Sequence, residues 1–127
     1  MNPSDERFPK TVRLRRRKEF LGVQRSPHRL VTQHFIVYAR PTGDRDTRIG
    51  ITVSRKVGRA HQRNRVKRLV REVFRMNRST VPSGLDAVLV ARPGRGLPDF
   101  GEVEAQLVSS LMELKQRVAK RKGKRRS

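Results

Sequence analysis

The sequence contains no cysteine and no tryptophan, and its only tyrosine is Tyr38. Without cysteine the chain forms neither disulfides nor thiolate metal sites, which fits a reducing compartment. No apolar run approaches the roughly 18 residues that a membrane-spanning helix needs. The first residues also lack the apolar segment of a signal peptide. We therefore expect a cytoplasmic protein.

Acidic residues are scarce as well. Asp and Glu number 11 against 32 Lys and Arg, which gives a formal net charge of +21. This charge argues against a neutral small substrate and for nucleic acid or an anionic membrane surface. Arg outnumbers Lys 24 to 8, and Arg is the side chain suited to bidentate contact with phosphate. Because residues 47–78 carry eleven basic groups and one acid, we expect a nucleic-acid partner at this central segment.

A chain of 127 residues predicts a single domain over residues 1–127, with disordered tails at residues 1–10 and 120–127. Apolar periodicity predicts helices near residues 15–24, 62–76 and 99–118, and strands near 34–40, 47–54 and 86–91. A turn at residues 41–44 predicts that the first two strands form an antiparallel hairpin. The order α-β-β-α-β-α is typical of a small α+β sandwich, a mixed sheet with helices packed on it.

Two of the predicted helices carry apolar stripes at helical spacing. The stripe of the middle helix is Val66, Leu69, Val70, Val73 and Phe74, and that of the last helix is Val103, Leu107, Leu111, Leu114 and Val118. Asp99 stands where it can cap the last helix. Residues 86–91 form a short, almost continuous apolar run, which predicts a central strand buried on both faces.

The middle helix is strongly basic on the side away from its apolar stripe. Asn64, Arg68, Arg71 and Arg75 follow one line along it, flanked by Arg63, Arg65 and Lys67, and Glu72 is its only acid. Such a helix repels itself unless an anion comes from outside, and cations near a helix N-terminus oppose the helix dipole. A solvated charged face is the alternative, but the density of charge favours a helix that lies against phosphates.

At these residues the sequence resembles bacterial ribonuclease P protein components. The likeness is carried by Arg63-Asn64-Arg65 with Arg68 and Arg71-Glu72, preceded by Ser54-Arg55-Lys56-Val57-Gly58, and it continues in one order over roughly residues 12–118. The resemblance implies a protein subunit that binds a large catalytic RNA and helps it to remove the 5′ leader of precursor tRNA. It also implies a left-handed β-α-β crossover, an exception to the usual right-handed rule.

The resemblance implies two surfaces. A basic face toward the catalytic RNA comprises Lys56, Arg63, Asn64, Arg65, Arg68 and Arg71. A cleft for the single-stranded leader comprises Phe20, Ile36 and Tyr38. Ile36 and Tyr38 share one strand face because side chains alternate along a strand, and aromatic rings with basic rims suit a single strand. Gln24 departs from the family pattern, since many members have a second aromatic or apolar residue there, so we expect a thinner stacking platform.

We expect no catalytic residue and no metal site in the protein. His28, His34 and His61 are scattered along the sequence, and Asp44 and Asp46 fall in a turn. A protein nuclease needs a base or clustered carboxylates beside the scissile phosphate. The resemblance places Mg²⁺ mainly on the RNA subunit, and it requires neither a membrane nor an oligomer of this chain.

Other functions fit part of the same pattern. A structural RNA-binding protein, such as a ribosomal protein, shares the charge and size but needs no cleft for a free single strand. A DNA-binding protein is conceivable for the basic helix, although no partner helix precedes it as a helix-turn-helix requires. Membrane binding fits least, because the basic helices need their apolar stripes for the core.

Overall fold

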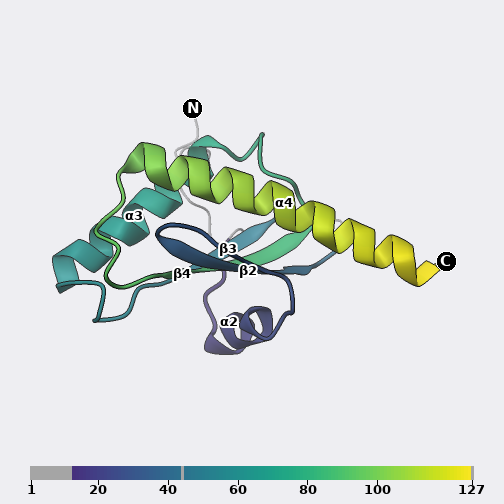
Figure 1. The fold of residues 1–127 in the computed structure, drawn as a ribbon, viewed down its shortest axis with the longest axis horizontal. Helices are drawn as coiled ribbons and strands as arrows, with labels where there is room; N and C mark the ends of the chain where they lie inside the picture. The colour runs from purple at the N-terminus through teal and green to yellow at the C-terminus, as the bar shows by residue number, and fades with distance from the viewer. Residues whose placement is uncertain (1–12, 44, 127) are drawn as a thin grey trace.

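The computed structural model describes residues 13–43 and 45–126, and for residues 120–126 it describes the backbone alone. The helices pack around one sheet (Figure 1). The elements are α2 (Arg17–Gln24), β1 (Arg29–Val31), β2 (Phe35–Pro41), β3 (Arg48–Thr52), α3 (Ala60–Met76), β4 (Leu85–Ala91) and α4 (Phe100–Arg126). The predicted α+β class and the predicted order of elements are confirmed, with β1 as an additional strand. The tail predicted at residues 1–10 lies outside the described residues.

The sheet has the strand order β1-β2-β4-β3. β4 pairs antiparallel with β2 and parallel with β3, while α3 connects β3 to β4. The predicted hairpin between the strands near 34–40 and 47–54 is therefore wrong, because β4 lies between them. A strand that is apolar on both faces is most stable with a neighbour on each edge and a layer on each face. The true hairpin joins β1 to β2, and β1 is too short at three residues for an alternating pattern to reveal it.

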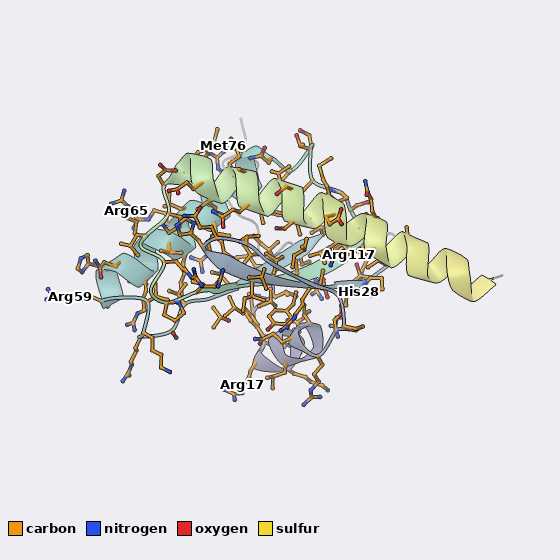
Figure 2. All side chains as sticks on the ribbon, in the orientation of Figure 1. Arg17, His28, Arg59, Arg65, Met76 and Arg117 are labelled. Carbon is orange, nitrogen blue, oxygen red and sulfur yellow. The ribbon has the colours of Figure 1, made fainter. Side chains whose placement is uncertain are left out.

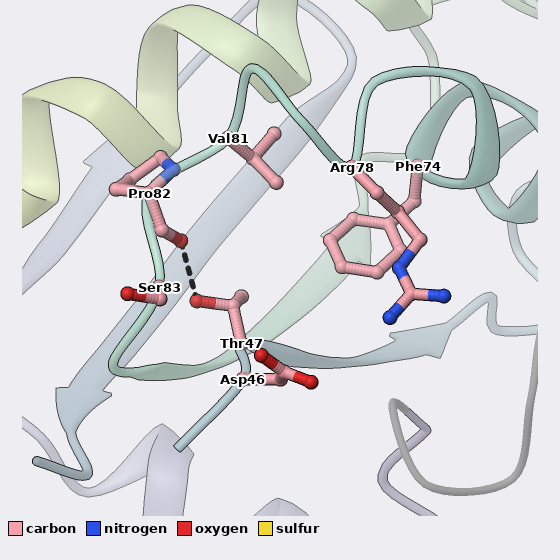
Figure 3. A pocket seen from close by; sticks show the side chains of 7 residues that line it. All are labelled: Asp46, Thr47, Phe74, Arg78, Val81, Pro82 and Ser83. Carbon is pink, nitrogen blue, oxygen red and sulfur yellow. Dashed lines mark hydrogen bonds between the residues drawn. The ribbon is translucent and has the colours of Figure 1, made fainter. Parts of the chain in front are cut away.

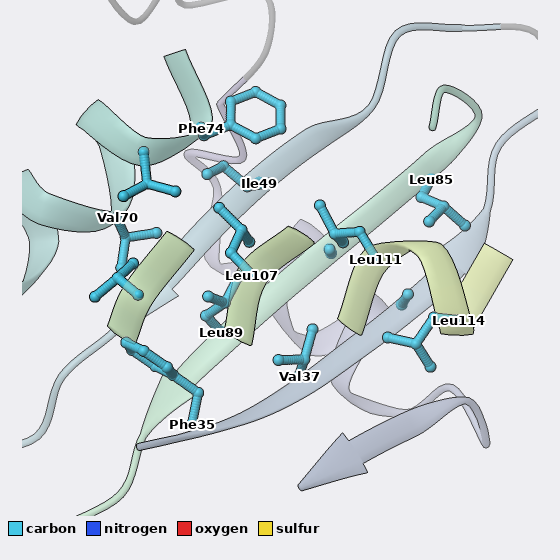
Figure 4. Close-up of a cluster of buried hydrophobic side chains, with 14 of the residues drawn as sticks. Phe35, Val37, Ile49, Val70, Phe74, Leu85, Leu89, Leu107, Leu111 and Leu114 are labelled. Carbon is cyan, nitrogen blue, oxygen red and sulfur yellow. The ribbon is translucent and has the colours of Figure 1, made fainter. Parts of the chain in front are cut away.

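One face of the sheet packs against α3 and α4 and forms the main core (Figure 4). The apolar stripes predicted for the two helices supply most of it. Val66, Val70, Val73 and Phe74 of α3 are buried, and so are all five predicted residues of α4. Alternate residues of β2, namely Phe35, Val37 and Ala39, join them from the sheet, together with residues of β3 and β4.

The other face of the sheet is covered only in part, by α2. A second cluster forms there from buried Leu14, Val23 and Val88, with Phe20 and Tyr38 packed against it. Gly50 of β3 makes room for the Phe20 ring, since a Cβ atom at Gly50 would lie 2.5 Å from Phe20 Cζ. The absence of a side chain at Gly50 therefore allows α2 to approach the sheet.

The last helix is longer than predicted. α4 begins after Asp99, whose Oδ1 accepts a hydrogen bond from Glu102 N at 2.8 Å, so the predicted cap is confirmed. The helix then continues to Arg126 and projects beyond the sheet (Figure 1), whereas we predicted a disordered tail from residue 120. Lys and Arg are good helix formers, and no proline interrupts residues 120–126. Within the described ranges, no helix combines the length and apolarity needed to cross a membrane.

Candidate nucleic-acid interface

The basic face lies on α3 and on the turn before it. We use this name for Lys56, Arg63, Asn64, Arg65, Arg68 and Arg71. All are exposed except Arg63, which is half-buried. Lys56 lies in a turn that closes when Val57 N donates to Ser54 O at 3.1 Å. Because the apolar stripe of α3 is fixed in the core, the opposite side of the helix must present these cations to solvent (Figure 2).

The start of α3 differs from the prediction. The helix begins at Ala60 rather than near Gln62, with Gln62 Oε1 accepting from Arg59 N at 2.8 Å. Arg65 consequently lies in the second turn, where the helix dipole opposes a cation less than we expected. No acid occupies the first turn. The free amides and the basic side chains there favour an anion from outside the chain.

The only acid of α3 is already paired. Both Glu72 carboxylate oxygens accept hydrogen bonds from Arg75, and these bonds hold the pKa of Glu72 below its ordinary value. Glu72 therefore neutralises none of the basic face. Partial burial of the Arg71 guanidinium lowers its pKa, and so does the nearby positive charge of Arg13. The sequence did not indicate Arg13 as part of this positive region. Its backbone forms a parallel bridge with Ile49 of β3.

A second candidate surface, the open sheet face, lies on the α2 side of the sheet. We define it by the predicted Phe20, Ile36 and Tyr38 together with Val31 and Val90. Val31, Ile36, Val90 and Thr52 are in register across the four strands, so they form one row. Val31 is 52% exposed, and Ile36 and Val90 are half-buried. Sequence reasoning missed Val31 and Val90, because the register that aligns them with Ile36 depends on the order of the strands.

The three predicted residues of this surface are not equivalent. Tyr38 lies opposite the buried Val88 and packs with Phe20 against the second cluster. Ile36 belongs to neither apolar cluster of the described residues. Phe20 and Tyr38 are thus packed against a cluster and partly exposed, whereas Ile36 contributes to the surface and to neither cluster. Gln24 is half-buried at the end of α2.

An ion-pair network, the Arg48 network, fastens α2 to the sheet. Arg48 donates from Nε and Nη2 to the two oxygens of Asp86 at 2.9 and 2.8 Å, and from Nη1 to Glu19 Oε2 at 2.9 Å. Asp86 is fully buried. The hydrogen bonds to Asp86 are the largest cause of the raised pKa of Arg48. Burial tends to raise the pKa of Glu19, but the amides of Arg16 and Arg15 and the Arg48 guanidinium lower it overall.

A small hollow between β3 and the end of α3 is not a ligand site. Phe74, Arg78 and Pro82 are among the residues that line it (Figure 3). Its volume of about 60 Å³ has room for water but not for a nucleotide. Thr47 spans it, donating to Pro82 O at 2.6 Å and accepting from Leu85 N at 3.2 Å. The hollow therefore belongs to the packing of the strand ends.

Several carboxylates of the described residues are engaged by basic side chains. In residues 13–43 and 45–126, no three His, Asp or Glu side chains gather where they could hold one. Asp86 and Glu19 are engaged by Arg48, and Glu72 by Arg75. Of the three histidines, His34 is buried, and its Nδ1 lies 2.8 Å from Gln106 Nε2.

The two surfaces lie on opposite sides of the sheet, α3 above it and α2 below it in Figure 2. One is basic and helical, and the other is apolar and aromatic with Arg29 and Arg40 on its own strands. Phosphates match the first, and unpaired bases match the second. Fold and site together define a small α+β protein of the RNA-binding class.

Comparison with known proteins gives the family. The Ribonuclease P family model matches residues 8–115. The ribonuclease P protein component of Citrifermentans bemidjiense is 40% identical over 112 residues, which cover 88% of this chain and 96% of that protein. The one from Chlamydia muridarum is 41% identical over 107 residues, with 84% and 88% covered. The solved RNase P protein from Thermotoga maritima has a TM-score of 0.70 at 38% identity, with 78% of this chain and 94% of that chain covered.

The chain therefore belongs to the ribonuclease P family and is a protein subunit that acts in tRNA processing. The resemblance recognised in the sequence is confirmed. A ribosomal or other purely structural RNA-binding role is not favoured.

Proposed function

We propose that this subunit binds the catalytic RNA through the basic face and the 5′ leader of precursor tRNA through the open sheet face. The observation that carries the proposal is the basic face itself, whose helix has one acid, already paired with Arg75. The open sheet face supports the second contact, since Tyr38, Ile36 and Val31 offer a partly exposed apolar surface for unpaired bases. The chain acts as the accessory subunit of an endoribonuclease in the cytoplasm.

Catalysis and Mg²⁺ belong to the RNA in this proposal. Magnesium ions stabilise the charge that develops on a phosphate during cleavage. The engaged carboxylates of Asp86, Glu19 and Glu72 support a site for these ions outside the protein. What the basic face contributes is a positive surface that keeps the RNA assembled when the concentration of Mg²⁺ is low.

Cleavage of a precursor tRNA by its catalytic RNA tests this function. At low Mg²⁺, the protein is expected to increase the rate of cleavage at the mature 5′ end, and the increase should fall as the leader is shortened. The measurement is the rate of leader release with and without the protein. Failure to stimulate, combined with tight binding to another RNA, would instead support the structural RNA-binding alternative.

Arg68→Ala is expected to weaken binding of the catalytic RNA. If about six side chains of the basic face neutralise phosphates, the plot of log affinity against log salt has a slope of roughly −4 to −5. Loss of one phosphate contact reduces this slope by about one. Binding titrations over a range of salt concentrations measure it. Arg78→Ala removes an exposed charge outside the basic face and is the control, and an unchanged slope for Arg68→Ala would remove Arg68 from the interface.

A further inference from the structure

A second hollow, the α2 groove, lies beside α2. Its lining consists of Arg17, Lys18, Glu19, Leu21, Gly22 and Arg25 of α2 with Arg40 of β2. The groove has a volume of about 550 Å³, which is within the range of ligand sites. None of the residues of the basic face or of the open sheet face belongs to it.

The groove is positively charged. Its only acid is Glu19, which Arg48 engages at 2.9 Å. In the described part of the chain, no acid forms an ion pair with Arg17, Lys18 or Arg25. All three side chains are exposed, so they are available to a phosphate.

Arg40, the fourth cation of the groove, is held in place by the sheet. Arg40 Nη2 lies 3.6 Å from Oδ2 of the buried Asp86. Its guanidinium also lies against the backbone of α2, because Gly22 has no side chain there. A Cβ atom at Gly22 would be 2.6 Å from Arg40 Nη1. Arg40 is therefore a positioned cation, whereas Arg17, Lys18 and Arg25 are free to adapt to a ligand.

The groove and the open sheet face share one side of the molecule. α2 stands over the rows of the sheet that contain Gly50 and Arg40, as the contacts of Phe20 and Gly22 show. The row of Val31, Ile36 and Val90 is farther along the strands. An RNA strand that leaves this row and passes over α2 reaches the groove after about one helix diameter, roughly 10 Å. Leu21, which is 40% exposed, lines the groove itself.

We propose that the α2 groove binds the phosphate backbone of single-stranded RNA that continues from the open sheet face, a more distant part of the 5′ leader. The proposal rests on the function proposed above for that face. The RNA that contacts α3 lies on the opposite side of the sheet, so it is the less favoured occupant. Contacts to phosphate are independent of sequence, so the groove extends the length of leader that is bound without selecting its bases.

The test compares two double variants that each remove two exposed positive charges. Lys18→Gln with Arg25→Gln alters the groove, and Arg45→Gln with Arg78→Gln is the control elsewhere on the surface. Each variant is assembled with the catalytic RNA. The affinity of this holoenzyme is then measured for precursor tRNAs whose leaders differ in length. The groove variant is expected to bind long-leader substrates about tenfold more weakly, as for the loss of two exposed charge contacts. Its affinity for short-leader substrates should match that of the control.

Gly22→Ala is a second variant that tests the groove without removing charge. The new methyl group displaces Arg40, while alanine favours the helix relative to glycine, so the protein should remain folded. We expect the same selective loss for long leaders, from a protein that still unfolds in one cooperative transition.

The outcomes separate the two proposals. If wild-type affinity depends on leader length but both groove variants follow wild type, the groove proposal is wrong and the open sheet face stands. A loss that is equal for all leader lengths would assign the groove to the catalytic RNA and would also overturn the proposal. If wild-type affinity is independent of leader length, the leader-binding function itself fails.

Discussion

Asp86→Asn is expected to lower the free energy of unfolding by about 3–5 kcal/mol, the usual cost of breaking a buried ion pair from one side. Asp86 is fully buried and accepts two hydrogen bonds from Arg48, with Arg40 at 3.6 Å. The amide would remove the negative charge that faces both guanidinium groups and would leave Arg48 with Glu19 alone. Because a small domain has only about 5–15 kcal/mol of stability in total, the variant should be close to unfolding.

Urea unfolding measures this effect, and Asp99→Asn is its matched control. Asp99 is exposed and caps α4, and Asn caps a helix about as well as Asp does. The same chemical change should therefore have little effect at residue 99. Equal midpoints for the two variants would show that the Arg48 network does not stabilise the fold.

Tyr38→Ala is expected to reduce the leader-dependent part of precursor-tRNA affinity by about 5- to 150-fold. Stacking of one base on an aromatic ring contributes about 1–3 kcal/mol, which converts to this range. The relevant quantity is the ratio of affinities for substrates with and without a leader. Loss of the ring should leave binding of the catalytic RNA unchanged, since Tyr38 lies on the other side of the sheet from the basic face.

Tyr38→Phe separates stacking from packing. It keeps a ring over Val88 and removes only the hydroxyl, so its leader-dependent affinity should remain near that of wild type. The free energies of unfolding of both variants, compared with that of wild type, show how much Tyr38 stabilises the second cluster. A leader-dependent affinity that survives Tyr38→Ala would exclude Tyr38 from the leader contact.

Local patterns predicted the helices well, because each depends on residues near one another in sequence. The stripe from Val66 to Phe74 fixes the buried side of α3, and it therefore fixes where Arg65 and Arg68 point. The Asp99 cap and the stripe from Val103 to Val118 did the same for α4. The helical part of the basic face therefore follows from the amino-acid sequence alone.

Pairing between distant segments was not accessible in the same way. The turn after Pro41 suggested a hairpin, but the need of β4 for two neighbours separates β2 from β3. Asp86 begins an apolar run, and its partner Arg48 is 38 residues away in sequence, so no local pattern joins them. The extension of the open sheet face to Val31 and Val90 depends on that same strand order.

The position of β4 also determines when the sheet can form during synthesis. β4 lies at the centre of the sheet but is the last strand of the chain to be made. Before Leu85–Ala91 leaves the ribosome, β2 has only β1 beside it, and β3 is still without the strand that pairs with all five of its residues. Contacts between distant segments form slowly because a long loop must close first. The nascent chain therefore has nothing to join its β1-β2 hairpin to β3 until its last quarter is translated, and a chain that ends before Leu85 lacks the central strand of the sheet.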